Sequence, residues 1–310
     1  MRWLVRTLAS VVPVVVGVVL GVFFLLRIVP GDPAQMILGD QATTASIEEL
    51  RSRLGLDLPL SQQFAAFLAG IVSNGDLGRS LVTDQPVSAL IGERVGITLA
   101  LVALALVFTV LLAVPLALAA AVNRDGPVDH VVRALPAVGM AMPAFWIGLL
   151  LVLVFGLGLR WFPVGGIGSG PGEPLRSLVL PALTVALGMS PPLVRSLREQ
   201  LVEVLDADFV ATARAAGLPA RRVLGVHVLR NAAVPTLALL GVNVAYLIGG
   251  TLVVEKVFAI NGMGALLFSA VSTRDFPVVQ GIALFCALAV VVVSLATDLL
   301  VGVLDPRLRR

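Results

Sequence analysis

An uncharged apolar segment from Gly96 to Val122 is the strongest constraint that this sequence places on its fold. A helix needs about 20 apolar residues to cross the hydrocarbon core of a bilayer, and this segment is long enough. Hydrophobic residues make up 58% of the 310 residues, whereas soluble domains typically contain about 45–50%. The sequence therefore predicts an all-α integral membrane protein.

The apolar segments predict six transmembrane helices. The first, 8–29, follows Arg2 and Arg6 and is expected to be retained, because a secretory signal would have a shorter apolar core and a small-residue cleavage site. A cleaved signal is the alternative. The other predicted spans are 96–122, 135–157, 178–194, 233–254 and 280–304. Six spans place both termini on one side, and the arginines that flank the spans favour the cytoplasm for that side.

Prolines predict an irregularity in the fourth span. Pro181, Pro191 and Pro192 lie in or near 178–194, and proline removes a backbone donor and clashes with the preceding helical turn. We therefore expect this span to be bent or broken near its inner end.

Residues 30–95 form the longest polar segment, and they contain eight acidic residues. This segment is predicted to lie on the outer face, because the first span would carry it across the membrane. Helix patterns predict two short helices within it, 46–54 and an amphipathic one over 61–72. The segment is thus expected to be a small helical insertion.

A second polar segment, 206–235, lies between the fourth and fifth predicted spans. It contains Arg214, Arg221, Arg222 and Arg230, and a central Arg costs roughly 2.5–3.5 kcal/mol on membrane-insertion scales. The segment must therefore lie outside the lipid. Apolar side chains at spacings of three and four predict one face of a short helix that ends at a Gly-Leu-Pro break: Phe209, Val210, Ala213, Ala216 and Gly217. A helix connected to spans at both ends can transmit movement, although a positive-inside bias alone would also explain the arginines.

This segment resembles the cytoplasmic coupling loop, the EAA motif, of importer-type ABC transporter permeases. The resemblance is carried by 213–218, 227–232 and Pro235, which read Ala-Arg-Ala-Ala-Gly-Leu, then His-Val-Leu-Arg-Asn-Ala, then Pro. The sequence of these residues is most similar to that of the dipeptide/oligopeptide/nickel branch of that family. The general motif has Glu-Ala-Ala where this chain has Ala211-Thr212-Ala213, and Asp208 is the nearest acid.

Other segments resemble the same branch, from Pro30 to Arg307. These segments are 30–33, 54–60, 75–80, 86–87, 254–264, 274–281 and 305–307. The resemblance implies a type I ABC importer permease fold with a scoop-like extracytoplasmic insertion, and a short re-entrant helix after the fifth span. It implies a first span at 1–29, an insertion at 30–95, and a transmembrane domain at 96–310 whose coupling loop covers 195–232.

The resemblance also implies partners. The permease is expected to pair with a second homologous permease, more often a different chain than an identical one, above two ABC ATPase subunits and below an extracytoplasmic substrate-binding protein. Membrane lipid surrounds it in a bacterial inner membrane. The residues expected to dock or couple to the ATPase are Asp208, Phe209, Ala213, Arg214, Ala216, Gly217, Leu218 and Arg221.

Two polar side chains in the fifth span, Asn243 and Tyr246, are candidates for lining the transport pathway. Interhelical hydrogen bonding explains them equally well. The cargo, whether a dipeptide, an oligopeptide, nickel or another solute, is not determined by these residues.

Several chemistries are excluded by the residues. The only lysine, Lys256, follows Glu255 and cannot belong to a P-loop, so any ATP hydrolysis belongs to partner subunits. His130 and His227 lie far apart, and the single Cys286 provides no disulfide or Cys-based metal site. No cofactor or enzymatic activity is expected. With a net charge of +3 and only 13% charged residues, nucleic acid is not an expected partner.

An ion-coupled secondary transporter is the alternative function. Such transporters usually have ionisable groups near the bilayer midplane, and here only Asp298 lies within a predicted span, near its cytoplasmic end. We expect Asp298 to pair with an arginine or a backbone donor instead.

Overall fold

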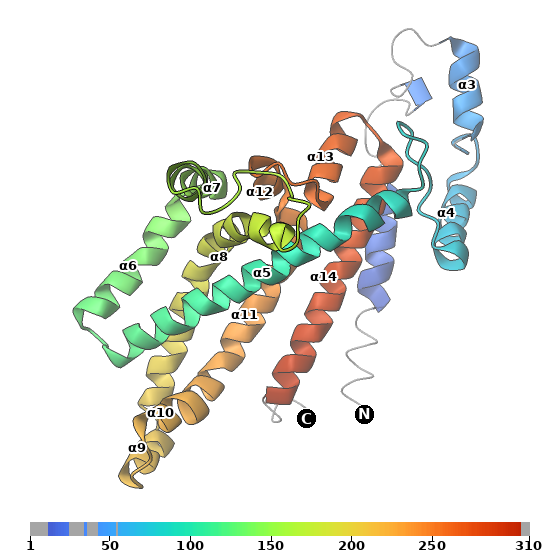
Figure 1. Ribbon diagram of the computed structural model, residues 1–310. Helices are drawn as coiled ribbons and strands as arrows, with labels where there is room; N and C mark the ends of the chain where they lie inside the picture. Colours follow the sequence, from blue (N-terminus) through green and yellow to red (C-terminus); the bar gives the residue numbers. More distant parts are fainter. Residues whose placement is uncertain (1–11, 25–33, 36–42, 54, 305–310) are drawn as a thin grey trace. The chain divides into compact units, whose positions relative to one another are not determined.

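The computed structural model describes residues 12–24, 34–35, 43–53 and 55–304. Within these ranges the chain is helical, and its extended pairing is limited to one antiparallel bridge between Arg79 and Pro86 (Figure 1). Four helices in them are long and apolar enough to cross a membrane: Val87–Val122, Glu173–Leu205, Ala220–Leu247 and Phe276–Val303. They confirm a helical, multi-pass membrane protein.

The chain divides into two compact units. One comprises 1–97 and 261–291, and the other comprises 98–260 and 292–310. Two long helices, α5 (Val87–Val122) and α14 (Phe276–Leu304), contribute residues to both units. Residues 261–291 thus group with residues 1–97 in one unit. The predicted domain boundary at 95 follows the sequence and stays a prediction.

Short helices in the first unit match the predicted ones. Helix α3 (Thr44–Arg53) begins two residues earlier than predicted, because the N–H of Ser46 donates to Thr43 Oγ1 (3.2 Å) and caps the helix there. Helix α4 (Leu60–Ala69) continues into the π-helical turn η1 (Gly70–Asn74). The apolar face of α4 packs through Phe64 on Phe23 of the helix Val12–Phe24, with ring centroids 5.0 Å apart.

A buried carboxylate organises the polar part of this unit. Asp275 is 4% exposed and lies between α13 (Met263–Ser272) and α14. It accepts hydrogen bonds from Ser80 Oγ (2.5 Å) and from the N–H of Leu81 (3.1 Å). The turn at the end of the segment 75–80, which resembles the same permease branch, is therefore fixed to the start of α14.

The second unit is a bundle built around α8 (Glu173–Leu205). Helices α6 (Pro127–Ala141), α7 (Ala144–Leu151) and α11 (Leu229–Gly250) all pack against α8. The short helix α12 (Leu252–Val257) packs on α7 and α8. Its buried Glu255 accepts hydrogen bonds from the hydroxyls of Thr98 (2.8 Å) and Thr251 (3.2 Å). Two short helices, α12 and α13, thus follow α11, and the re-entrant helix after the fifth span stays a prediction.

The glycine-rich loop after α7 and its π-helical extension η2 (Val152–Gly158) is packed on α12. The N–H of Gly166 donates to the carbonyl of Phe258 (2.8 Å), and a Cβ on Gly165 would lie 3.0 Å from that same oxygen. Any larger residue at 165 would therefore have to displace the backbone at Phe258 slightly. The loop is thus anchored to the bundle.

The predicted third span, 135–157, does not form one helix. Helix α6 ends at Ala141 and α7 begins at Ala144, with Pro143 between them in an extended conformation (φ −61°, ψ 139°). Proline lacks the N–H that would continue the helical ladder. In the fourth predicted span, α8 continues through Pro181, Pro191 and Pro192 to Leu205. Of the two expected outcomes, a bend or a break, the break is absent and the bend stays a prediction.

Some predictions fall outside the described residues. They are the ends of the predicted first span (8–11 and 25–29), the segments 30–33 and 305–307, and residue 54 of the Gly-Leu-Asp motif. The predicted total of six spans therefore stays a prediction.

Close packing at Gly241 generates a stability prediction. A Cβ at Gly241 of α11 would lie 2.3 Å from Thr297 Oγ1 and 2.8 Å from Thr297 Cβ on α14, so Gly241→Ala forces the two helices apart. Overpacking of this kind costs about 1–3 kcal/mol. Thermal unfolding in detergent should show a lower Tm for Gly241→Ala. The matched control is Gly188→Ala in α8, where a Cβ meets nothing within 4 Å; equal Tm values for the two variants would contradict this packing.

Candidate functional site

The candidate site is the polar segment after α8, which forms a short helix as predicted. Helix α9 covers Asp208–Ala215, with Asp208 in its first turn and Arg214 in its last, where each charge opposes the helix dipole. Gly217 follows with φ +74°, a conformation that strongly favours glycine. Pro219 then begins the short turn α10 (Ala220–Arg222). The predicted Gly-Leu-Pro break is confirmed.

One side of α9 is buried in the bundle core. Val210 is fully buried, and Ala213 and Leu218 are half-buried against the same cluster. The cluster that contains Val210 also includes residues of α5, α6, α8, the π-helical segment η3 (Val223–Val228) and the start of α11, among them Leu197, Leu201, Val223, Val228 and Ala232. Helix α9 packs directly on η3, and Val210 joins it to the core that the longer helices share.

The opposite side of α9 is open. Phe209 is 46% exposed, although the spacing placed it on one apolar face with Val210. Adjacent residues in a helix point about 100° apart, so the buried stripe takes Val210 and leaves Phe209 outside. Asp208, Ala216, Gly217 and Arg221 are exposed as well. The structure divides the predicted docking residues between a packed side and an open side.

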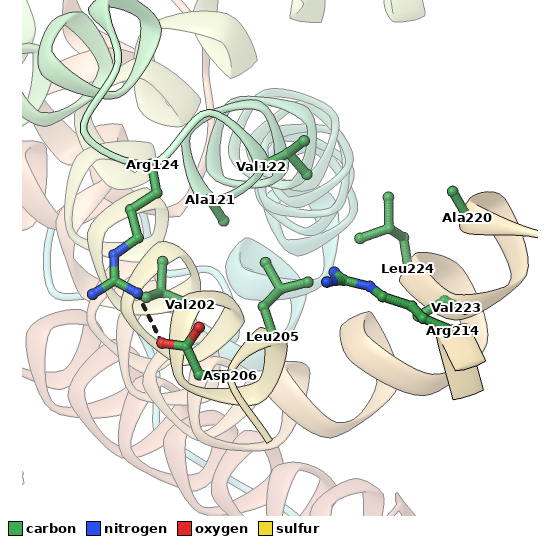
Figure 2. A pocket seen from close by; sticks show the side chains of 10 residues that line it. All are labelled: Ala121, Val122, Arg124, Val202, Leu205, Asp206, Arg214, Ala220, Val223 and Leu224. Atoms are coloured by element: carbon green, nitrogen blue, oxygen red, sulfur yellow. Dashed lines mark hydrogen bonds and ion pairs between the residues drawn. The ribbon is translucent and has the colours of Figure 1, made fainter. Parts of the chain in front are cut away.

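An exposed ion pair links the segment that follows α5 to the segment that follows α8. Arg124, just after α5, donates to Asp206, just after α8, at 2.8 Å (Figure 2). Both side chains are more than half exposed, and such pairs contribute only about 0–1 kcal/mol. This contact positions the loop without fixing it strongly.

A buried ion pair lies nearby and is the stronger contact. Asp129, in the first turn of α6, is fully buried and receives two hydrogen bonds from Arg198 of α8, at 2.9 and 2.5 Å. The N–H of Asp125 is a third donor, at 3.0 Å. The Arg198 hydrogen bonds, the largest effect, and this backbone N–H hold the pKa of Asp129 below its ordinary value of 3.8, against the opposing effect of burial.

Sequence reasoning missed this pair. The position of Arg198 was the feature that could have indicated the pair. Arg198 lies four residues after Val194 and three before Leu201, and because both are buried, Arg198 lies on the inward side of α8. An arginine at such a position needs a buried acid as partner, and Asp129 at a helix start is a suitable candidate.

The candidate pathway residues are not brought together with the coupling segment. Asn243 donates through Nδ2 to the carbonyl of Leu239 on its own helix (2.8 Å), so this amide is engaged within α11. Tyr246 is 78% exposed. Asp298 is exposed too, and the ion pairs among the described residues do not include it. Its pairing with an arginine or a backbone donor stays a prediction. The described residues contain no cluster of metal ligands.

Comparison with known proteins assigns this architecture to a class. Residues 113–310 match the model of the binding-protein-dependent transport system inner membrane component, and residues 1–103 match the model of the N-terminal part of such components. The chain belongs to the family of binding-protein-dependent transport system inner membrane components. It is a permease subunit of an ABC importer and not an enzyme, and the ion-coupled alternative is not favoured.

Individual relatives cover essentially the whole chain. It is 38% identical over 309 residues to a putative peptide transport system permease protein of Brucella abortus, with 99% of this chain and 98% of the relative covered. A protein of the same description from Brucella suis is 38% identical over 307 residues, covering 98% of each. The glutathione transport system permease protein GsiC of Salmonella typhi is 35% identical over 309 residues, covering 100% of this chain and 99% of the relative.

The buried ion pair generates a stability prediction. Asp129→Asn leaves the Arg198 guanidinium, only 16% exposed, without its counter-charge. Removing one partner of a buried pair costs about 3–5 kcal/mol, so the variant should unfold at a markedly lower temperature in detergent. Arg195→Gln is the control, because it breaks an exposed pair with Glu199 on the same helix, a pair of a kind worth roughly 0.3–0.5 kcal/mol. A similar small shift for both variants would show that the Asp129 pair does not stabilise the bundle.

The same pair predicts a pH dependence. Because the folded-state pKa of Asp129 lies below 3.8, its contribution to the free energy of unfolding is present above that pH and is lost as the pH falls through the lowered pKa. The difference in Tm between wild type and Asp129→Asn should be constant down to about pH 5 and should shrink below about pH 4. A difference that stays unchanged down to about pH 2 would contradict this assignment.

Proposed function

We propose that this chain is one of two permease subunits that together form the pathway of a peptide importer in the bacterial inner membrane. A second homologous permease, two ABC ATPase subunits and an extracytoplasmic substrate-binding protein complete the assembly. Six spans place both termini in the cytoplasm. The family membership supports this assembly, since its members are described as components of binding-protein-dependent systems.

In this proposal the segment 195–232 is the coupling loop, and the open side of α9 docks on an ATPase subunit. Phe209 supplies an exposed aromatic anchor beside Asp208, Ala216, Gly217 and Arg221. Large aromatic side chains are enriched among residues that dominate binding energy at protein interfaces.

The packed side of α9 transmits the movement. When ATP binding closes the two ATPase subunits, the docked helix is displaced, and Val210, Ala213 and Leu218 carry the displacement into α8 and α11. The observation that supports this proposal is the complete burial of Val210 in a cluster that also contains residues of α5, α6, α8, η3 and α11. Interiors are close-packed and transmit strain instead of absorbing it. Hydrolysis and release of its products then return the inward-facing state.

The N-terminal part of the chain has a separate role in the proposal. Residues 1–29 form the first span, and 30–95 form the outer, scoop-like insertion that receives the substrate-binding protein. The transmembrane domain is 96–310. The turn fixed by Asp275 gives part of the insertion a defined shape, as a docking surface requires.

The proposed cargo is a peptide or a related small solute. Relatives named for peptide and for glutathione transport, each matching almost the whole chain, support this class. Asn243 and Tyr246 stay proposed pathway residues. Tyr246 is exposed on α11 in this single subunit, which would let it face the second permease across the pathway.

Replacing the exposed anchor tests the docking role. Phe209→Ala should leave the fold intact, because the side chain is 46% exposed, and should weaken assembly with the ATPase by about 2 kcal/mol or more, roughly 30-fold in affinity. Substrate-stimulated ATP hydrolysis and uptake in proteoliposomes should fall together. The measurement is co-purification of the ATPase subunits, followed by both assays.

Leu175→Ala is the matched control. Leu175 is 62% exposed at the opposite end of α8, so its loss removes a similar apolar surface away from α9. Leu175→Ala should assemble with the ATPase and transport like the wild type. If Phe209→Ala does so as well, docking through this side of α9 is refuted.

A further inference from the structure

The ends of α5 and α8 and the segment from α9 to η3 enclose a pocket of about 420 Å³ (Figure 2). Its walls are mainly apolar and include Val122, Val202, Leu205 and Leu224. Its charged residues are Arg124, Asp206 and Arg214. A pocket with long apolar walls and a few charged groups is suited to a molecule that is itself part apolar and part charged.

The charges in the pocket do not cancel. Arg124 is paired with Asp206 at 2.8 Å. Arg214 makes no ion pair or side-chain hydrogen bond with any residue that the structure describes. The pocket therefore carries one uncompensated positive charge, and its ligand should be an anion.

Arg214 is exposed, and its side chain lines this pocket. It lies four residues after the buried Val210, on the same side of the helix. Figure 2 shows its guanidinium extending from α9 toward Leu205. The side chain is therefore separated from Phe209, the proposed docking anchor, and is available for another ligand.

The depth of the pocket identifies the source of the anion. Ala121 and Val122, two lining residues, are the last residues of α5, which has the most apolar 18-residue stretch of the four candidate spans, with a mean hydropathy of 2.9. The polar residues Asn123 and Arg124 follow directly. The end of such a span lies where hydrocarbon gives way to phospholipid head groups, so the anions present at this level in quantity are lipid phosphates.

We propose that this pocket binds one anionic phospholipid. The phosphate lies against Arg214, and the upper part of an acyl chain lies along Val122, Leu205 and Leu224. A bound lipid fills the space between the coupling segment and the spans, so the composition of the membrane acts on the region that α9 moves. This site uses the packed side of α9, and it does not depend on the docking role of Phe209.

The test uses the purified full chain in detergent and native mass spectrometry. Dioleoyl phosphatidylglycerol and dioleoyl phosphatidylcholine are titrated separately, because they share acyl chains and differ in head-group charge. Wild type should bind its first phosphatidylglycerol about fivefold more tightly than phosphatidylcholine, the effect expected of one arginine near a membrane surface. Arg214→Gln should abolish that preference.

Two further variants separate the pocket from the rest of the loop. Arg221→Gln should keep the wild-type preference, because Arg221 is exposed on the same loop and does not line the pocket. Ala220→Trp fills the pocket from its rim and should weaken the first binding event for both lipids while Arg214 is still present. The melting temperature of every variant is measured as well. A variant that melts at the wild-type temperature is folded, so its loss of lipid binding does not come from misfolding.

Three results would overturn the proposal. One is an unchanged phosphatidylglycerol preference in Arg214→Gln. Another is binding of sn-glycerol 3-phosphate, which lacks acyl chains, as tightly as the lipid, since that would make the site one for a small soluble anion. The third is loss of the bound lipid on assembly with the ATPase subunits together with cross-linking of position 214 to an ATPase acid, which would make Arg214 a protein contact.

Discussion

The packing of Val210 is the contact on which the rest of this account depends. It is a fully buried side chain on an eight-residue helix that otherwise faces water. Isolated helices of this length are not stable in water, so α9 depends on the burial of Val210 in the bundle core and on its packing against η3. The same burial connects a displacement of α9 to the core that the long helices share.

Electrostatic contacts around this packing act at two strengths. The buried pair of Asp129 and Arg198 joins α6 to α8 close to the site and is shielded from solvent, whereas the exposed pair of Arg124 and Asp206 is weak and easily broken. This combination allows a rigid bundle to carry a loop that adjusts its position. Arg214 stands apart from both pairs, with its charge directed at an apolar pocket.

Much of this organisation follows from the sequence, and the exceptions have physical reasons. The uncharged run in α5 and the break at Gly217 are local properties, so pattern alone predicts them correctly. Helix α8 continues without a break through three prolines, where proline chemistry predicts a bend or a break, because its packing in the bundle keeps the helix continuous. Pro143 does end a helix at a place where hydropathy predicts one span. The Asp129–Arg198 pair joins residues 69 positions apart, and such long-range pairing is not readable from periodicity.

Site-directed cross-linking tests the central claim most directly. The chain has one cysteine, Cys286, so Ala216→Cys in a Cys286→Ser background places a single reactive thiol on the exposed side of the α9 segment. In the assembled transporter we predict a cross-link from position 216 to an ATPase subunit, with a yield that changes when ATP is bound. A thiol at 216 that reacts with membrane-impermeant reagents from the outer face of intact cells, and forms no cross-link to an ATPase subunit, would contradict the account.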